Sequence, residues 1–299
     1  MLPFRAMFST EIRAGLHETG AARSPLELLR EAIEEVLSRR RLIRYLVSAD
    51  MKKRGSDTLL GNLWWIMDPL LQMVVYIILV TIIRSRTTPD YPLFLFCALL
   101  PWKWYSAVIT DATTCVVRAD KLIRQIAFPK IVLPIATATA GVVGFAWGLV
   151  PLVGILAFYP DRWSPLILLL PIIAIVQYVF STATAVIVAA VNVFFRDLGN
   201  VIGHLLRLWW FLSPGLYSLA QLDDIGFVRS HGWVQVLFGL NPFAVLFEAY
   251  RAVAYGTPES PPYLPNLAPL LVLLAGSLAL LVVGAVFFKR LEPDFAKVL

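Results

Sequence analysis

The sequence predicts an all-α integral membrane protein, on the evidence of its composition and its apolar runs. The chain has 299 residues, of which 59% are hydrophobic and only 15% are charged, whereas soluble domains carry roughly 25% charged residues. A helix needs about 20 mainly apolar residues to cross a bilayer core. Six stretches meet or approach that length, and the fifth is short and interrupted by Pro214. They are residues 63–83, 93–117, 131–158, 165–195, 203–220 and 267–288.

Residues 1–58 hold no such run and are predicted to form a cytoplasmic N-terminus, ahead of a membrane domain at 59–299. Ser24-Pro25-Leu26-Glu27 has the residue types of a helix start, with a capping serine, a proline and a glutamate three residues after the cap. The basic stretch SRRRLIRYLVSADMKKRG follows at 38–55. We expect amphipathic helices here that lie in the inner interface, among anionic headgroups. They either anchor the chain and set its topology or receive an anionic lipid.

The basic residues predict the orientation. Six spans place both termini on one side of the membrane, and that side holds 20 of the 26 Lys and Arg residues. By the positive-inside rule, both termini are predicted to be cytoplasmic. Because the positive charge follows topology, nucleic-acid binding is poorly supported. Cys97 and Cys115 lie in apolar runs and match no metal spacing, so no metal site is expected.

The loop between the fifth and sixth spans is predicted to lie on the outer side. Its middle, GWVQVLFGLNPFAVLFEAYRAVAYG at 232–256, is too apolar for a solvated loop. It is also too broken for a span, because Asn241-Pro242 divides it. We expect short re-entrant helices within about 225–256, where irregular backbone must pack on protein or line a cavity.

Common catalytic motifs are absent from the sequence. It has no GxxxxGK[ST] phosphate loop, no HExxH, no CxxC and no GxSxG, and its three histidines are scattered. Asp223-Asp224 is the one acidic pair that could serve a membrane enzyme, and its position in a solvent-exposed loop explains it without such a role. The sequence therefore favours a protein that moves or binds something over a membrane enzyme.

Three charged residues stand out inside predicted spans, where a central charge costs roughly 2.5–3.5 kcal/mol. They are Asp68, Lys103 and Asp111. The eight-residue spacing of Lys103 and Asp111 puts them on one side of a helix, about 12 Å apart, which indicates a polar stripe toward a pathway. Aromatic residues accompany them, and these either line a passage for sugars or form an interfacial belt beside a snorkelling lysine. The candidate aromatic residues are Trp102, Trp104, Tyr105, Trp209 and Trp210.

Two predicted cytoplasmic segments have the composition of docking elements. In VRADKLIRQIAFPK, residues 117–130, Asp120 can start a short amphipathic helix, and NVFFRDLGNVIG at 192–203 makes a tight turn. Each is either a loop that sets topology or a contact for a soluble partner. The candidate contact residues are Asp120, Lys121, Leu122, Ile123, Arg124, Phe128, Arg196 and Asp197.

In their order along the chain, these motifs resemble the membrane permeases of ATP-binding-cassette polysaccharide exporters of the ABC-2 class. That family includes O-antigen, capsule and teichoic-acid transporters. The match runs from about Tyr45 to Arg290 and comprises GxLWxxxxPLL, YPLFLFxxLLPWxxY, KLIRQIAFPKIVLP, FFRDL, WWFLSPGLY and NPFAVLFEAYR.

The resemblance implies a homodimer that forms a channel, with two copies of a separate ATPase that binds ATP and Mg²⁺. This chain would hold no cofactor and would not itself be an enzyme. Its cargo would be a polysaccharide on undecaprenyl diphosphate, exported across the bacterial inner membrane. Alternatives are an exporter of a lipid or drug-like molecule and a membrane glycan-modifying enzyme.

The resemblance also implies roles for particular segments. Residues 118–130 would be the coupling helix, and Asn241, Pro242, Glu248 and Arg251 would belong to the outer gate. The diphosphate needs positive charge where it enters. The basic candidates for that entrance are Arg39, Arg40, Arg41, Arg44, Lys52, Lys53 and Arg54.

Overall fold

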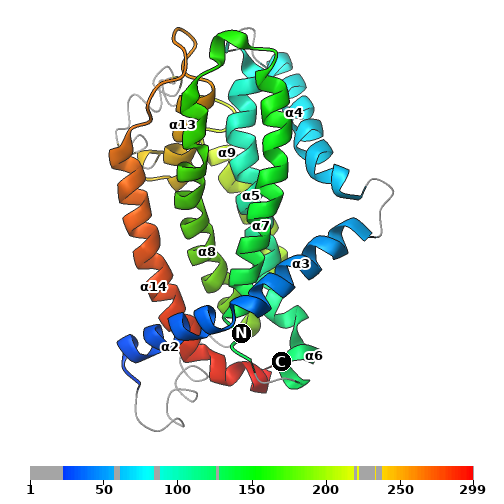
Figure 1. The fold of residues 1–299 in the computed structure, drawn as a ribbon, viewed down its shortest axis with the longest axis vertical. Coiled ribbons are helices and arrows are strands. Elements are labelled where there is room, and N and C mark those ends of the chain that lie inside the picture. The colour runs from blue at the N-terminus through cyan, green and yellow to red at the C-terminus, as the bar shows by residue number, and fades with distance from the viewer. Residues whose placement is uncertain are drawn as a thin grey trace, which may run out of the picture.

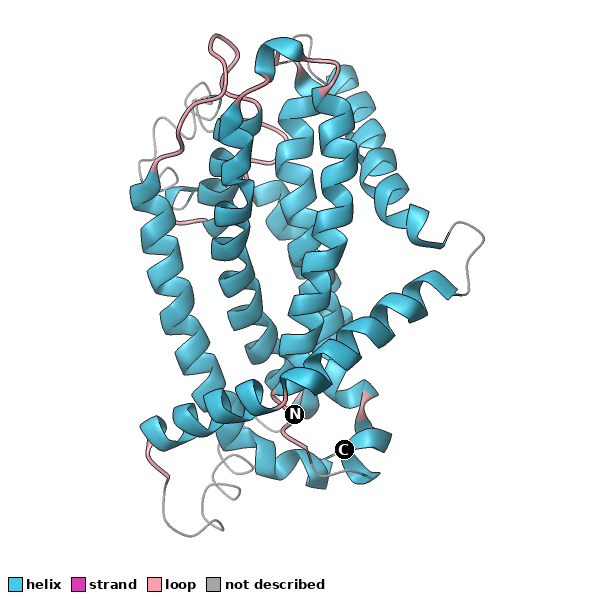
Figure 2. Ribbon diagram, in the orientation of Figure 1, coloured by secondary structure: helices cyan, strands magenta, loops and turns pink. Residues whose placement is uncertain are grey.

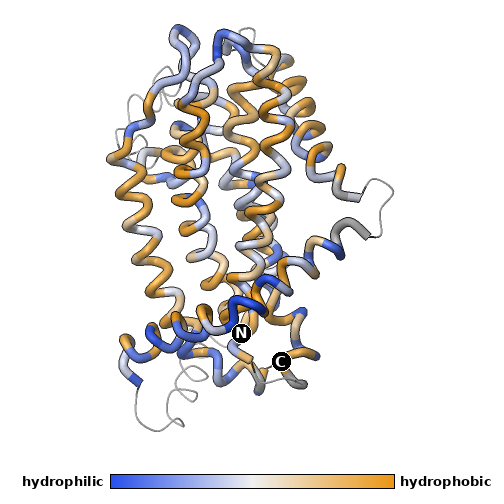
Figure 3. Tube along the Cα trace, in the orientation of Figure 1, coloured by the Kyte–Doolittle hydropathy of each residue, from blue (hydrophilic) through white to orange (hydrophobic). Residues whose placement is uncertain are grey.

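A computed structural model describes residues 23–56, 61–83, 88–125, 128–218, 221, 233 and 238–298, and these form a helical bundle without a strand (Figures 1 and 2). Five helices in this part of the chain are long and apolar enough to cross a membrane. They are α4 (Trp64–Ile83), α5 (Tyr91–Arg118), α7 (Val132–Leu156), α8 (Leu170–Phe194) and α14 (Leu267–Val298). Figure 3 shows apolar positions along these helices and polar positions gathered toward the two ends of the bundle.

The predicted fifth span differs from the other five. It corresponds to α9 (Leu198–Leu212), whose 15 residues rise only about 22 Å. The helix begins five residues earlier than predicted and ends where Ser213 adopts extended backbone, just before Pro214. Proline cannot continue a helical hydrogen-bond ladder, so α9 stays shorter than its neighbours.

Helix α5 is the centre of the bundle and packs on α4, α7, α8, α9 and α13 (Pro242–Ala254). Its apolar window is 78% buried, whereas that of α4 is only 17% buried. Glycines bring α7 close to α5: a Cβ on Gly141 would lie 2.3 Å from Val108 Cγ2, and one on Gly148 would lie 2.1 Å from Leu100 Cδ1. Small residues allow such close approach between membrane helices.

Two helices precede the bundle, α2 (Pro25–Ser38) and α3 (Arg40–Ser56). The predicted helix start is confirmed: the Glu27 backbone N–H donates to Ser24 Oγ, and the Ser24 N–H donates to the Glu27 carboxylate. α2 crosses the end of the bundle that also holds α6 (Asp120–Gln125), and α3 rises from it toward α4 (Figure 1). We name this the α6 end. That α2 and α3 lie in the membrane interface stays a prediction.

A buried arginine organises the opposite end of the bundle. Arg162, in the 3-10 turn η2 (Pro160–Arg162), donates to the carbonyls of Thr257 and Ser260, both at 2.7 Å, and pairs with Asp90 at 3.0 Å. It thereby joins three loops.

The predicted re-entrant helices are tested only in part. Residues 222–232 and 234–237 lie outside the described chain, and α13 is the described helix of that region.

Candidate functional site

A groove lies between α4, α5 and α7, with Met51 of α3 at its edge and a volume of about 350 Å³. Its α7 wall includes Gly144, where an added Cβ would meet no atom within 4 Å. Trp64 of α4 also lines the groove and is 44% exposed. The groove therefore opens on the side of the bundle.

An ion pair joins α4 to α5 inside this groove. Lys103 Nζ contacts the Asp68 carboxylate, and the two side chains are 29% and 58% exposed. Lys103 lies twelve residues into α5, about 18 Å along the helix axis, which places it near the helix centre. A charge at that depth is costly unless it is paired or faces a polar cavity. Asp111 lines the same groove, as its spacing from Lys103 predicts.

A second cavity of about 220 Å³ extends the groove toward the α6 end and shares Asp111 and Thr137 with it. Arg118 lines this cavity and lies 3.9 Å from Asp111. The six charged residues of the two cavities, three acidic and three basic, are here named the polar column. They are Asp50, Lys53, Asp68, Lys103, Asp111 and Arg118.

Most of the predicted basic entrance lies away from the polar column. Of its residues, Lys53 lines the second cavity, and the side chain of Arg54 lies outside the described part. The remaining five are exposed on the N-terminal helices and their junction, and they line neither cavity. They are Arg39, Arg40, Arg41, Arg44 and Lys52.

The aromatic residues predicted to line a passage occupy two different positions. The Trp102 ring lies 4.8 Å from that of Phe243 and 5.5 Å from that of Trp210, and the Tyr105 ring stacks on Phe180 at 5.3 Å. Trp102, Tyr105 and Trp210 are at most 5% exposed. Within the single chain their rings fill the core between α5, α8, α9 and α13, and a lining role for these three stays a prediction. Trp209 is partly buried against this core, and Trp104 reaches the groove.

Two of the predicted gate residues act as anchors in this structure. Arg251 is 3% exposed, and its guanidinium donates to the carbonyls of Pro214 and Gly215, both at 2.7 Å. Asn241 caps α13 by accepting from the Phe243 N–H, and its amide donates to Ser213 Oγ at 2.9 Å. These contacts join the end of α9 to α13. Pro242 is the first residue of α13, and Glu248 is exposed and accepts from the Tyr263 hydroxyl.

The predicted docking segments lie at the α6 end. Ile123 and Phe128 pack against the core there, Leu122 is half-buried, and Asp120 is the first residue of α6. The side chain of Arg124 and residues 126–127 lie outside the described part. The exposed candidates are Lys121, Arg196 and Asp197.

Helix α9 carries a polar surface that the sequence pattern did not predict. His204 and Arg207 are exposed there beside the exposed apolar side chains of Leu205 and Leu208. Arg207 lies nine residues into the helix, about 14 Å along its axis. The sequence predicts that this helix begins at Gly203, which places Arg207 near its cytoplasmic end. The helix instead begins at Leu198, so Arg207 lies well inside it. Among the described residues, no group of three or more His, Cys, Asp or Glu could hold a metal ion.

Comparisons with known proteins point in one direction. The chain is 32% identical over 266 residues to the O-antigen export system permease protein RfbA of Myxococcus xanthus, an alignment that covers 89% of this chain and 98% of that protein. Two RfbA permease proteins of Klebsiella pneumoniae are 26% and 24% identical, each over 86% of this chain and 95% of their own length. No protein-family profile matches the chain.

Proposed function

The chain belongs to the family of O-antigen export system permeases, and from this premise we propose that it is the membrane subunit of an ATP-driven polysaccharide exporter. Its cargo is a glycan carried on undecaprenyl diphosphate, which crosses the bacterial inner membrane. Two copies of the chain form the passage, and two copies of a separate ATPase bind the α6 end, which is cytoplasmic. The bundle has six spans, of which the fifth along the chain is α9 with the segment that follows it.

The sideways opening of the groove carries this proposal. A lipid-linked substrate must keep its hydrocarbon chain in the bilayer while its diphosphate and sugars move through polar surroundings. The groove offers both environments, since it opens at Trp64 and holds the Asp68–Lys103 ion pair. The polar column continues from there to Lys53 on α3, where the diphosphate would enter.

The exposed surfaces of α4 and α9 support a passage between two copies. Arg207 is exposed well inside α9, and a charge at such a depth is unstable against lipid unless it meets water or another polar group. A second copy that faces α9 across an aqueous passage supplies that environment. The low burial of α4 leaves a further surface for the partner.

Charges at the α6 end support a contact with the ATPase. Lys121 on α6 is exposed, as are Arg196 and Asp197 in the turn between α8 and α9. Both segments follow a membrane helix directly, so a force applied to them reaches the bundle. The sequence has no phosphate-binding loop, and the ATP is therefore assigned to the separate subunit.

Blocking the groove tests the proposed function. Gly144→Leu places a side chain in the groove where no atom lies within 4 Å of the new Cβ, and Gly154→Leu is the matched control on the same helix, also with open space and not on the groove. Each variant is expressed together with the ATPase in cells that lack the native permease, and glycan at the cell surface is measured. We expect export to fall about tenfold for Gly144→Leu, a loss of about 1.4 kcal/mol, and to stay unchanged for Gly154→Leu. Normal export by both variants contradicts a path through the groove.

A further inference from the structure

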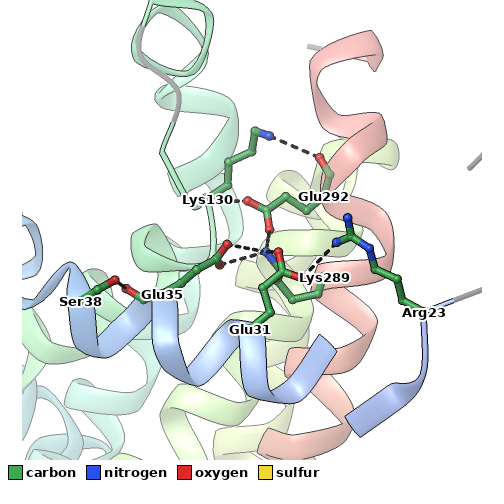
Figure 4. Close-up of polar contacts among 7 residues, drawn as sticks. All are labelled: Arg23, Glu31, Glu35, Ser38, Lys130, Lys289 and Glu292. Atoms are coloured by element: carbon green, nitrogen blue, oxygen red, sulfur yellow. Dashed lines mark hydrogen bonds and ion pairs between the residues drawn. The ribbon is translucent and has the colours of Figure 1, made fainter. Parts of the chain in front are cut away.

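A buried lysine joins helices α2 and α14 at the α6 end (Figure 4). Lys289 Nζ lies 3.0 Å from Glu31, 2.9 Å from Glu35 and 2.8 Å from Glu292. Glu31 and Glu35 belong to α2, and Lys289 and Glu292 belong to α14. The Lys289 side chain is only 6% exposed, so three carboxylates surround one ammonium group away from solvent.

Glu292 extends this contact to the loop that follows α6. Its carboxylate accepts from the Lys130 backbone N–H at 2.6 Å, and its carbonyl accepts from Lys130 Nζ at 3.4 Å. Arg23 pairs with Glu31 at 3.1 Å from the other side. Three basic and three acidic groups thus balance in one cluster, here named the α14 junction. Its members are Arg23, Glu31, Glu35, Lys130, Lys289 and Glu292.

The same end of α14 also meets the turn between α8 and α9. Arg196 donates to the Val298 carbonyl at 3.2 Å. The Phe295 ring is fully buried, with its centroid 5.8 Å from Phe194 and 5.2 Å from Phe288. Both segments predicted to contact the ATPase are therefore tied to the last three turns of one helix.

Burial of Lys289 makes the α14 junction costly to break. Removing one partner of a buried ion pair leaves an uncompensated charge and is strongly destabilising. The pKa values of the two α2 carboxyls move in opposite directions. Burial raises the pKa of Glu35 despite Lys289, and Glu31 is held below its ordinary pKa because Lys289 and Arg23 outweigh its own burial. Because Lys289 contacts all three carboxylates, the pairing across the junction depends on Lys289 more than on any single carboxylate.

We propose that Lys289 is a positioning residue that makes the loop after α6, the end of α14 and helix α2 move as one body. A displacement received at α6 then passes through Lys130, Glu292 and Lys289 to α2. From α2 it passes along α3 to Met51 and Lys53, which line the two cavities. The ATPase stroke would in this way act on the mouth of the groove. The source of that stroke rests on the proposed function, but the one-body contact does not.

Hydrogen exchange on the purified full chain tests the contact without any ATPase. Lys289→Met removes the ammonium group, and we expect faster exchange both across α2 and at the Lys130 amide, by about tenfold or more. Lys289→Arg keeps the charge and should preserve the protection. Lys297→Met is the matched control on the same helix, because Lys297 is 67% exposed and pairs with Asp294. Faster exchange in α2 alone, with the Lys130 amide unchanged, overturns the proposal.

Transport by the assembled complex tests the role of the contact. We expect Lys289→Met to bind the ATPase and hydrolyse ATP while exporting about tenfold less glycan for each ATP. The proposal is overturned if Lys289→Met exports as much glycan for each ATP as the unmutated complex does. If the unmutated complex itself exports no glycan, the proposed function is contradicted instead. Should Lys289→Met fail to fold, Glu292→Gln weakens the links of residue 292 to Lys130 and Lys289 and leaves the Lys289 pairs with Glu31 and Glu35 in place. It should lower the same ratio, and an unchanged ratio again overturns the proposal.

Discussion

Replacing Arg251 by methionine tests whether this residue anchors the bundle or gates a passage. Its guanidinium donates to four carbonyls, those of Pro214 and Gly215 at 2.7 Å, Phe94 at 3.3 Å and Tyr217 at 3.4 Å. It also lies 3.6 Å from the centroid of the Phe94 ring. Methionine keeps an apolar stem of similar length but has no donor. The carbonyls that follow α9 would then lose their hydrogen-bond partners inside the protein.

The two short hydrogen bonds determine the expected loss of stability. A hydrogen bond from a charged donor contributes about 1.5–3 kcal/mol, so two of them contribute about 3–6 kcal/mol. Removing the guanidinium also removes the cost of burying its charge, which offsets part of this loss. We expect the free energy of unfolding to fall by about 3–4 kcal/mol, a loss typical of a disrupted buried polar network. Arg251→Lys should recover only part of it, because an ammonium group lacks the planar fork of donors.

Denaturant titration in detergent micelles measures the effect on the free energy of unfolding. Lys121→Met is the control, because that lysine is exposed on α6, outside the spanning helices, and should change stability by no more than about 0.5 kcal/mol. A loss below about 1 kcal/mol for Arg251→Met would refute the anchoring argument. Loss of export at unchanged stability would instead support the gate that the sequence predicts.

Two further predictions concern the groove and the opposite end of the bundle. Lys103→Met leaves the Asp68 carboxylate unpaired and should lower stability by about 2–3 kcal/mol. The double variant Lys103→Met with Asp68→Leu should regain most of that loss; additive effects of the two changes in a double-mutant cycle would contradict the ion pair. Gly256 has a φ of +84°, and a Cβ there would lie 2.5 Å from the Ser260 carbonyl oxygen. Gly256→Ala should therefore lower the free energy of unfolding by about 1–3 kcal/mol, which is measured as a lower melting temperature. Gly276→Ala is the control, because its new Cβ has open space and the change should not be destabilising. Equal melting temperatures for the two variants would contradict the argument from strain.

Local patterns in the sequence predicted much of the fold. The apolar runs located the five long helices, because an apolar segment of sufficient length must form a helix to satisfy its backbone in lipid. The start of α2 followed from Ser24 and Glu27, whose reciprocal hydrogen bonds span only three residues. The common side of Lys103 and Asp111 followed from helix geometry. All of these features depend on neighbours within about two turns, so the sequence by itself determined them.

Only the tertiary structure decided which distant groups meet. Asp68 pairs with Lys103 because α4 and α5 pack in one particular register, and Arg251 reaches Phe94 across 157 positions of the chain. Lys289 pairs with Glu35 across 254 positions of the chain, and no local pattern in the sequence indicates that contact. The Trp102 side chain is likewise buried in the core, because α9 and α13 pack against it. Such contacts follow from the packing of whole helices, which the sequence pattern along one helix does not contain.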